Sequence, residues 1–194
     1  MNGNHRSQNY FLKYVKTDHN ILNVGCGSVE FSSELSKYCN HVTAIDISPE
    51  MIAIAEKEVV RSGNPENIRF ICQDIMRWNP DDKYDVIFAN YFLNTFAWKD
   101  CEIVINHILK MVKDNGLLCI ADEITGKHFF TKAEQFAFRP LITYLHHVLA
   151  DHPLHSIYDY TPLILKKGFV EIEAKRDKSD YICSWTYAKK QQNV

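Results

Sequence analysis

Short apolar runs alternate along this chain with longer segments whose apolar residues recur at helical spacing. The runs of strand length are residues 21–24, 42–46, 68–72, 84–90, 116–122, 169–175 and 181–188. Their nearly continuous apolar character is typical of strands that are buried on both faces. Strands that alternate with helices predict a parallel sheet covered by helices.

The segments between these strands predict helices at residues 31–39, 49–61, 101–113, 129–149 and 161–167. Start and stop signals support the second of them, because Ser48 can cap it, Pro49 suits the first helical position and Gly63 follows its end. We expect the third helix to stop at Asn115-Gly116, with a strand following at once.

The chain has 194 residues and 46% hydrophobic content, which is enough for one well-buried core and short for two. We therefore expect residues 1–194 to form a single domain. The longest irregular span, residues 125–159, lies between the fifth and sixth strands and is rich in aromatic residues and histidine. A binding lid would be placed in such an insertion, so we expect a lid around residues 125–160.

Charge and cysteine usage narrow the partners and the compartment. A net charge of −2 gives no general attraction to nucleic acid or anionic lipid. No apolar run approaches the length that spans a bilayer, and residues 1–8 lack the apolar core of a signal peptide. The 6 cysteines form no CxxC pair and look like buried thiols of a reducing compartment. We expect a cytoplasmic protein without a nucleic-acid partner or a membrane span, and the oligomeric state stays open.

The turn after the first strand, in ILNVGCGSVE (residues 21–30), carries the first candidate chemistry. Gly25 and Gly27 let the backbone turn sharply and approach a ligand closely. A G-x-G-x-x-G pyrophosphate loop would have glycine at Glu30, where a carboxylate would repel the phosphates. No G-x-x-x-x-G-K-[ST] motif occurs either. The ligand class that remains is a nucleoside without phosphates.

Two carboxylates follow the next two strands at the same edge of the predicted sheet, where open parallel sheets bind ligands. Asp46 ends the second strand, about twenty residues after the glycines, and is placed to accept hydrogen bonds from both hydroxyls of a ribose. Asp74 follows the third strand and presents a second carboxylate there.

Four segments in order resemble motifs of the class I S-adenosylmethionine-dependent methyltransferases: ILNVGCGS, VTAIDISPEMIAIA, IRFICQDI and YDVIFANYFLN. The stretch YDYTPLILKKGF is similar to the small-molecule branch, including the ubiquinone/menaquinone methyltransferases. The resemblance covers nearly the whole chain. It implies an α/β fold, a three-layer Rossmann-like sandwich whose seven-stranded, mostly parallel sheet has an antiparallel last strand. It also implies an enzyme that uses S-adenosylmethionine as cofactor and a small-molecule methyl acceptor.

The resemblance further implies a set of cofactor-binding residues at four strand ends. They are Gly25, Cys26 and Gly27 beside the methionine part, Asp46 at the ribose, Met51, Asp74 and Ile75 at the adenine, and Asn90 and Tyr91 closing the site, with Asn23 and Ile47 completing the set. The sequence departs from the family pattern at two positions. Asn23 stands where the family usually has an acidic residue, and Val29 stands where it often has glycine. An asparagine can accept a hydrogen bond from the methionine amine but cannot neutralise it.

The catalytic residues stay open at this level. Methyl transfer from a sulfonium is an in-line displacement in which the protein chiefly aligns the reactants, whereas a hydroxyl or ring-carbon acceptor would need a general base. The segment after the fifth strand offers His128, His146, His147, His152, His155, Tyr158, Asp159 and Tyr160. We take His128, His147 and Tyr91 as the catalytic candidates. The alternatives are purely structural histidines or a metal site, and we expect no metal because adjacent histidines on a helix point about 100° apart.

Two other functions are compatible with the same motifs. One is a catalytically silent S-adenosylmethionine-binding regulatory or partner protein, which Asn23 and Val29 motivate. The other is aminopropyl transfer, which would need acidic residues for a polyamine, and the sequence has no dedicated cluster of them. A DNA amino-methylating enzyme would carry (N/D)PP(Y/F) after the fourth strand, where this chain has ANYF, and this difference argues against nucleic acid as substrate.

Overall fold

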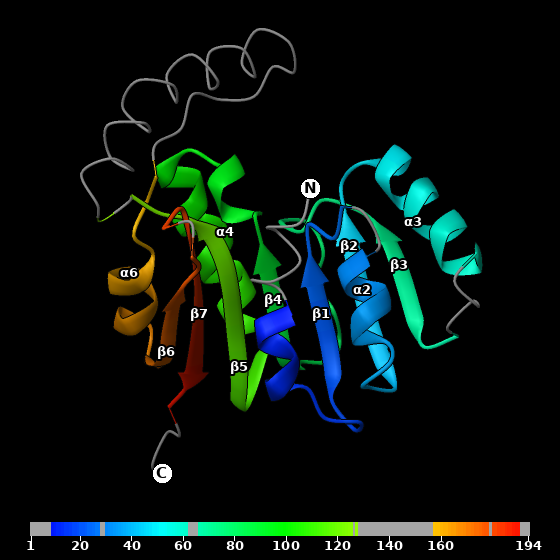
Figure 1. Cartoon of the computed structure of the whole chain (residues 1–194), viewed down its shortest axis with the longest axis horizontal. Coiled ribbons are helices and arrows are strands. Elements are labelled where there is room, and N and C mark those ends of the chain that lie inside the picture. Colours follow the sequence, from blue (N-terminus) through cyan, green and yellow to red (C-terminus); the bar gives the residue numbers. More distant parts are fainter. Residues whose placement is uncertain are drawn as a thin grey trace, which may run out of the picture.

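A computed structural model describes residues 9–27, 30–61, 66–125, 127, 157–178 and 180–190. In this part of the chain, seven strands form one sheet (Figure 1). They are β1 (Asn20–Val24), β2 (His41–Asp46), β3 (Ile68–Cys72), β4 (Tyr84–Asn90), β5 (Val112–Glu123), β6 (Phe169–Arg176) and β7 (Ile182–Lys189).

The strand order is β3-β2-β1-β4-β5-β7-β6. The pairs among β1 to β5 are parallel, and β7 runs antiparallel to both β5 and β6. The sheet therefore confirms the predicted α/β fold with an antiparallel last strand. Each predicted strand is present, with ends that differ by a few residues at most.

Helices cover both faces of the sheet, because alternate residues of each buried strand point to opposite sides. The helices are α2 (Glu30–Leu35), α3 (Pro49–Arg61), α4 (Trp98–Lys110) and α6 (Thr161–Lys166), with 3₁₀ turns η1 (Tyr10–Tyr14) and η2 (Leu93–Thr95). Residues of η1 and α2 pack with Ile21, Val86 and Phe88. Residues of α4 and α6 pack with Leu22 and Ile87 on the other face.

The cap predicted for α3 is confirmed. Ser48 Oγ accepts the backbone N–H of Met51 at 3.2 Å, and the Ser48 carbonyl accepts that of Ile52 at 3.1 Å. Pro49 is the first residue of the helix, where its missing N–H costs nothing. The pair Ser48-Pro49 therefore fixes the start of α3, directly after the turn that follows β2.

The predicted helix stop at Asn115-Gly116 is wrong. Helix α4 ends at Lys110 and β5 begins at Val112, so Asn115 and Gly116 belong to the strand. The register with β4 shifts there, from Tyr84 opposite Val112 to Val86 opposite Leu117. Asn115 has φ +63°, and a Cβ on Gly116 would lie 3.0 Å from the Asp85 carbonyl oxygen. The pair thus forms a strand irregularity where two backbones approach closely.

Two other predicted helices also need comment. Helix α2 ends at Leu35, shorter than the predicted span 31–39. The predicted helix 129–149, Gly63 and nearly all of the expected lid lie outside the described residues.

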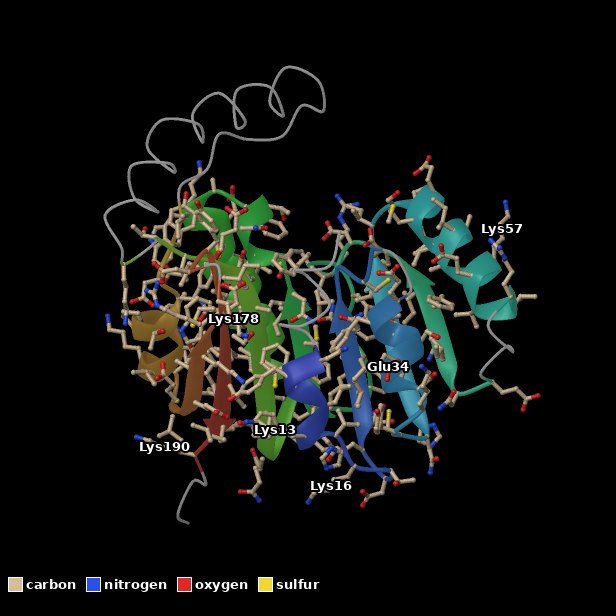
Figure 2. All side chains as sticks on the ribbon, viewed as in Figure 1. Lys13, Lys16, Glu34, Lys57, Lys178 and Lys190 are labelled. Atoms are coloured by element: carbon tan, nitrogen blue, oxygen red, sulfur yellow. The ribbon has the colours of Figure 1, made fainter. Side chains whose placement is uncertain are left out.

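Two polar contacts join η1 to Glu173 on the edge strand β6. Lys13 Nζ lies 2.5 Å from Glu173 Oε2, and the Tyr14 hydroxyl donates to the same oxygen at 2.6 Å. Figure 2 shows Lys13 on η1, which lies in front of the sheet in this view. In the described part of the chain, no helix is long and apolar enough to cross a bilayer.

Candidate functional site

The parallel strands β1 to β5 end along one edge of the sheet (Figure 1), and most of the predicted cofactor residues lie there. Strands β1 and β4 are neighbours in register, with Val24 opposite Ala89, so Gly25 and Asn90 follow at the same level. The adjacent β2 ends at Asp46. The sequence motifs that are far apart along the chain therefore meet at this edge.

The Asp46 carboxylate fixes the geometry of the turn after β1. Its Oδ2 accepts the backbone N–H of Gly27 at 2.9 Å, and its Oδ1 accepts that of Ser48 at 3.0 Å. Each carboxylate oxygen has a second lone pair, which leaves acceptor capacity for hydroxyl groups of a ligand. Ile47, the next residue, is 68% exposed at the turn between β2 and α3.

The glycine turn needs glycine for two reasons. Gly25 has φ +61° and Gly27 has φ +50°, a region that L side chains rarely adopt. In addition, a Cβ on Gly25 would overlap the ring of Phe92, which therefore lies directly against the turn. Phe92 was not among the predicted site residues, and its own sequence position, after ANY, carried no signal for this contact.

Cys26 lies between the two glycines but does not serve as a nucleophile. Its backbone N–H donates to the Ile45 carbonyl at 3.0 Å, and its side chain packs with Ala44 and Ile52. Burial and the nearby Asp46 carboxylate raise the pKa of the thiol to about 12. The thiol is therefore protonated at neutral pH and acts as a small apolar side chain.

Asn90 presents an unpaired amide at this edge. The residue is 8% exposed, and neither Oδ1 nor Nδ2 has a hydrogen-bond partner in the described part of the chain. A buried amide without partners is costly, so this group fits a site that a polar ligand completes. Tyr91, which follows, has φ +53° and donates its backbone N–H to the Ala121 carbonyl at 2.7 Å. Such strain in a non-glycine residue is common at binding sites.

Asn23 has a structural partner. It is buried in β1, and its Nδ2 donates to Ser32 Oγ at 2.9 Å, which ties the strand to α2. The structure thus places this predicted residue in β1, two residues before Gly25, with its amide nitrogen bonded to Ser32.

The predicted adenine-side residues follow β3 and begin α3. Asp74 Oδ1 accepts the backbone N–H of Met76 at 2.9 Å, and Arg77 Nε lies 3.8 Å from Asp74 Oδ2. Ile75 is buried in the core below the turn. Met51 lies in the first turn of α3, next to the segment that Asp46 holds.

Asp122, at the end of β5, was missed by the sequence analysis. It is fully buried, and its Oδ2 accepts the backbone N–H of Asn94 and the hydroxyl of Tyr160, both at 3.1 Å. Its Oδ1 accepts the backbone N–H of Glu123 at 2.8 Å. Burial raises the pKa of the Asp122 carboxyl to about 7, although these hydrogen bonds oppose the shift.

Only part of the predicted catalytic set lies in the described chain. His128 and His147 lie outside it, as do His146, His152 and His155. Tyr160 donates to Asp122, and burial raises the pKa of its hydroxyl. The hydroxyl therefore keeps its proton at neutral pH and does not accept one from a methyl acceptor. Asp159 accepts the Thr161 backbone N–H at 3.0 Å, and the ring of Tyr158 lies 5.2 Å from that of Trp98.

A cavity of about 600 Å³ lies elsewhere, at the opposite ends of the strands. Its lining includes the first residues of β1, β2, β3 and β4, which are Asn20, His41, Ile68 and Tyr84. Because ligands of open parallel sheets bind beyond the carboxyl ends, this cavity is separate from the candidate site.

Residues 21–116 match the family model described as "Methyltransferase domain". The chain is 29% identical over 182 residues to malonyl-[acyl-carrier protein] O-methyltransferase 2 of Ilyobacter polytropus, covering 92% of this chain and 66% of that protein. It is 33% identical over 114 residues to malonyl-[acyl-carrier protein] O-methyltransferase 1 of the same organism, covering 57% of this chain and 40% of that protein. The chain thus spans 40% and 66% of the lengths of these two relatives.

Among solved structures, the N-methyltransferase NodS from Bradyrhizobium japonicum WM9, in complex with S-adenosyl-L-homocysteine, shares the fold. The TM-score is 0.70 with 16% sequence identity, and the match covers 97% of this chain and 86% of that one. These likenesses show that residues 21–116 carry a methyltransferase domain, and the motifs at one edge of the sheet and the fold are those of class I S-adenosylmethionine-dependent methyltransferases.

Proposed function

We propose that this protein binds S-adenosylmethionine at the carboxyl edge of β1 to β4 and transfers its methyl group to a small-molecule acceptor. When bound, the cofactor supplies a methyl group on a positively charged sulfur, which a nucleophile attacks in line. The protein has to bind the cofactor, align the acceptor and exclude water.

The observation that carries this proposal is the unpaired, buried amide of Asn90 beside the glycine turn. An amide offers both a donor and an acceptor, so it fits a zwitterionic methionine moiety without adding charge. Asp46 holds Gly27 in place and keeps acceptor capacity for ribose hydroxyls. The ring of Phe92 covers Gly25 and narrows access to the turn.

We propose that the acceptor is a group that is already nucleophilic, such as a carboxylate. Tyr160 and Cys26 hold their protons at neutral pH. An acceptor that is already nucleophilic, such as a carboxylate, needs no base. Two relatives are named for O-methylation of malonyl-[acyl-carrier protein], so we include a carrier-bound malonyl carboxylate among the acceptors.

Isothermal titration tests the cofactor site. We expect S-adenosylmethionine and S-adenosylhomocysteine to bind in the micromolar range, and Asp46→Ala to weaken both by about tenfold or more, since a hydrogen bond to a charged group contributes roughly 1.5–3 kcal/mol. Asp85→Asn is the matched control. Asp85 also accepts a backbone N–H, from Asn20 at 2.8 Å, but it lies at the opposite end of the sheet. Absence of binding by the folded wild-type protein rejects the proposal.

A methyl-transfer assay tests the acceptor. The panel consists of malonyl thioester on a carrier protein, free carboxylic acids, phenols or quinols, and amines, with mass spectrometry identifying the methylated product. Transfer to one class names the substrate class. Tight cofactor binding without transfer to any acceptor contradicts the enzymatic proposal and favours a silent binding protein.

We also place the protein in the cytoplasm. All six cysteines are free thiols, and five of them are buried, as expected of a chain that folds in a reducing compartment.

A further inference from the structure

The segment that follows β4 is hydrogen-bonded to two successive residues of β5. Tyr91 donates its backbone N–H to the Ala121 carbonyl at 2.7 Å, and Asn94 donates its own to the Asp122 carboxylate at 3.1 Å. Between these two attachments lies Phe92, whose ring packs against Gly25. The position of Phe92 at the glycine turn therefore depends on bonds made at the end of β5.

Asp122 also reaches a distant part of the chain. Tyr160, directly before α6, donates its hydroxyl to the same carboxylate oxygen that binds Asn94, at 3.1 Å. One buried oxygen thus joins the segment after β4 to the segment that enters α6. The ring of Tyr158, two residues earlier, lies 5.2 Å from that of Trp98 at the start of α4, at an interplanar angle of 48°, so the segment before α6 also contacts α4.

The groups that face Asp122 are acidic or neutral. They are Glu123 on β5, Cys101 on α4, Tyr160 before α6, and Cys183, its register partner on β7. No lysine, arginine or histidine in the described part of the chain makes an ion pair with it. Hydrogen-bond donors alone therefore hold the charge of the carboxylate.

The protonation state changes these bonds. As a carboxylate, Asp122 accepts from all three donors, and charge-assisted bonds are about twice as strong as neutral ones. As a carboxylic acid, it carries its own O–H and needs an acceptor for it. The Tyr160 hydroxyl is the group that can reverse its direction, and the bond to the Asn94 N–H then becomes a neutral one.

We propose that Asp122 is a positioning residue for methyl transfer, whose ionised carboxylate holds residues 91–95 against the glycine turn and ties them, through Tyr160, to the segment before α6. Protonation of Asp122 loosens both attachments. This inference rests on the proposed function, because it assigns Asp122 a role at the acceptor side of the same site. Asp122 is fully buried, so in this role it acts through the segment that carries Tyr91 and Phe92.

Steady-state kinetics between pH 6 and pH 8.5 test the role. We expect wild-type kcat/KM for the acceptor to rise about tenfold as Asp122 ionises, with kcat/KM of Asp122→Asn about tenfold below wild type at pH 8, within threefold at pH 6 and without the wild-type rise. The Kd for S-adenosylhomocysteine should change by less than about threefold in this variant. Tyr160→Phe should keep the pH dependence, because the titrating carboxyl remains, but with a lower plateau.

Asp85→Asn is again the control, since it removes a carboxylate that binds the backbone N–H of Asn20 and the Nζ of Lys113 at the other end of the sheet. The inference is wrong if Asp122→Asn keeps the wild-type dependence of kcat/KM on pH. It is also wrong if Asp122→Asn and Asp85→Asn both lower kcat/KM by one factor that is the same at every pH.

A second measurement needs no activity and separates this inference from the proposed function. The hydrogen bond from Asn94 favours the ionised carboxylate, so a local opening that breaks it while Asp122 stays buried becomes harder as the pH rises. Amide hydrogen exchange of Asn94 through such local openings, corrected for its intrinsic pH dependence, should show protection that increases from pH 6 to pH 8 in the wild type and stays constant in Asp122→Asn. Protection that does not change with pH in the wild type overturns the inference even if methyl transfer is confirmed. A pH-dependent protection in a protein that transfers no methyl group would keep the structural role and reject the proposed function.

Discussion

Gly27 donates its backbone N–H to Asp46 Oδ2 at 2.9 Å, so the end of β2 holds the turn that follows β1. The other oxygen of Asp46 holds Ser48, the cap of α3, at 3.0 Å. One side chain thus sets the relative position of two loops that both border the candidate cofactor site. These two backbone N–H groups orient the Asp46 carboxylate, which lowers the cost of ordering it when a ligand binds.

Asp46→Asn should keep the fold but lose part of this arrangement, because an amide has a single acceptor oxygen for two backbone donors. We expect a loss of about 1–3 kcal/mol in the free energy of unfolding, measured by urea denaturation. Saturating S-adenosylhomocysteine should stabilise the wild type more than the variant, since the ligand binds the native state only. Equal stabilisation of both would contradict the role of Asp46 in the site.

Gly25→Ala should be strongly destabilising, because Gly25 has φ +61° and an added Cβ overlaps Phe92. Gly168→Ala is the matched control, since Gly168 has φ +84° but no atom within 4 Å of an added Cβ. The control should cost about 1–2 kcal/mol from backbone strain alone. The extra loss in Gly25→Ala, measured by denaturation, reports the overlap.

Combining Gly25→Ala with Phe92→Ala separates the two effects further. Removal of the ring should recover the overlap cost but not the backbone cost, so the double variant should be more stable than the sum of the two single losses predicts. Strict additivity would mean that Phe92 does not pack on the turn in solution.

Asn90→Leu should stabilise the ligand-free protein and weaken cofactor binding. The substitution replaces a buried amide that has no partner in the described chain by an apolar side chain of similar volume. We expect a gain of about 1 kcal/mol or more in the free energy of unfolding, together with at least tenfold weaker binding of S-adenosylhomocysteine. A variant that is both less stable and unimpaired in binding would contradict our interpretation of Asn90.

The free energy of unfolding should fall as the pH rises from about 4 to about 7, because of Asp122. Burial raises the pKa of the Asp122 carboxyl from its ordinary value of 3.8 to about 7 in the folded protein, so the folded state binds more protons than the unfolded state in this window. The contribution is about 4–5 kcal/mol at most, at ~1.4 kcal/mol per pKa unit. Asp122→Asn should remove this loss, which denaturation at pH 5 and pH 8 measures. An unchanged difference between the two pH values would show that Asp122 does not titrate in this range.

Cys72 should be the first thiol to react with maleimide at neutral pH. It is exposed at the end of β3, whereas the other five cysteines are buried. Burial raises the pKa of Cys26 and Cys101 to about 12 and that of Cys39 to about 11, so they hold little thiolate. Mass spectrometry after brief labelling should find one modified cysteine, and Cys72→Ser should abolish the fast phase. Rapid modification of Cys26 would mean that the glycine turn opens in solution.

The features that the sequence predicted correctly depend on local or periodic signals. Strands such as β4 are recognisable because burial on both faces makes them apolar throughout. The start of α3 follows from Ser48-Pro49 alone. Asp46 was identified because the spacing between glycine turn and acidic residue reflects one βαβ unit.

The features that were missed depend on contacts between distant residues. Asn115-Gly116 carries the same local signal in a helix stop and in a strand irregularity, and only the pairing of β5 with β4 decides between them. Asp122 looks like an ordinary acidic residue at a strand end. Burial in the folded chain raises its pKa, and the donors that hold it are distant in sequence: Asn94 lies 28 residues earlier and Tyr160 lies 38 residues later.

The antiparallel placement of β7 has a consequence for biosynthesis. Among the described strands, β6 pairs only with β7, and β7 in turn separates β6 from β5. During translation β6 therefore emerges before any strand that it pairs with, and the exposed edge of β5 also waits until residues 182–189 leave the ribosome. Unpaired edges of this kind are sites of aggregation. Strand β7 has to enter between β5 and β6. An interruption of synthesis after β6 and before β7 therefore leaves the edges of both β5 and β6 open.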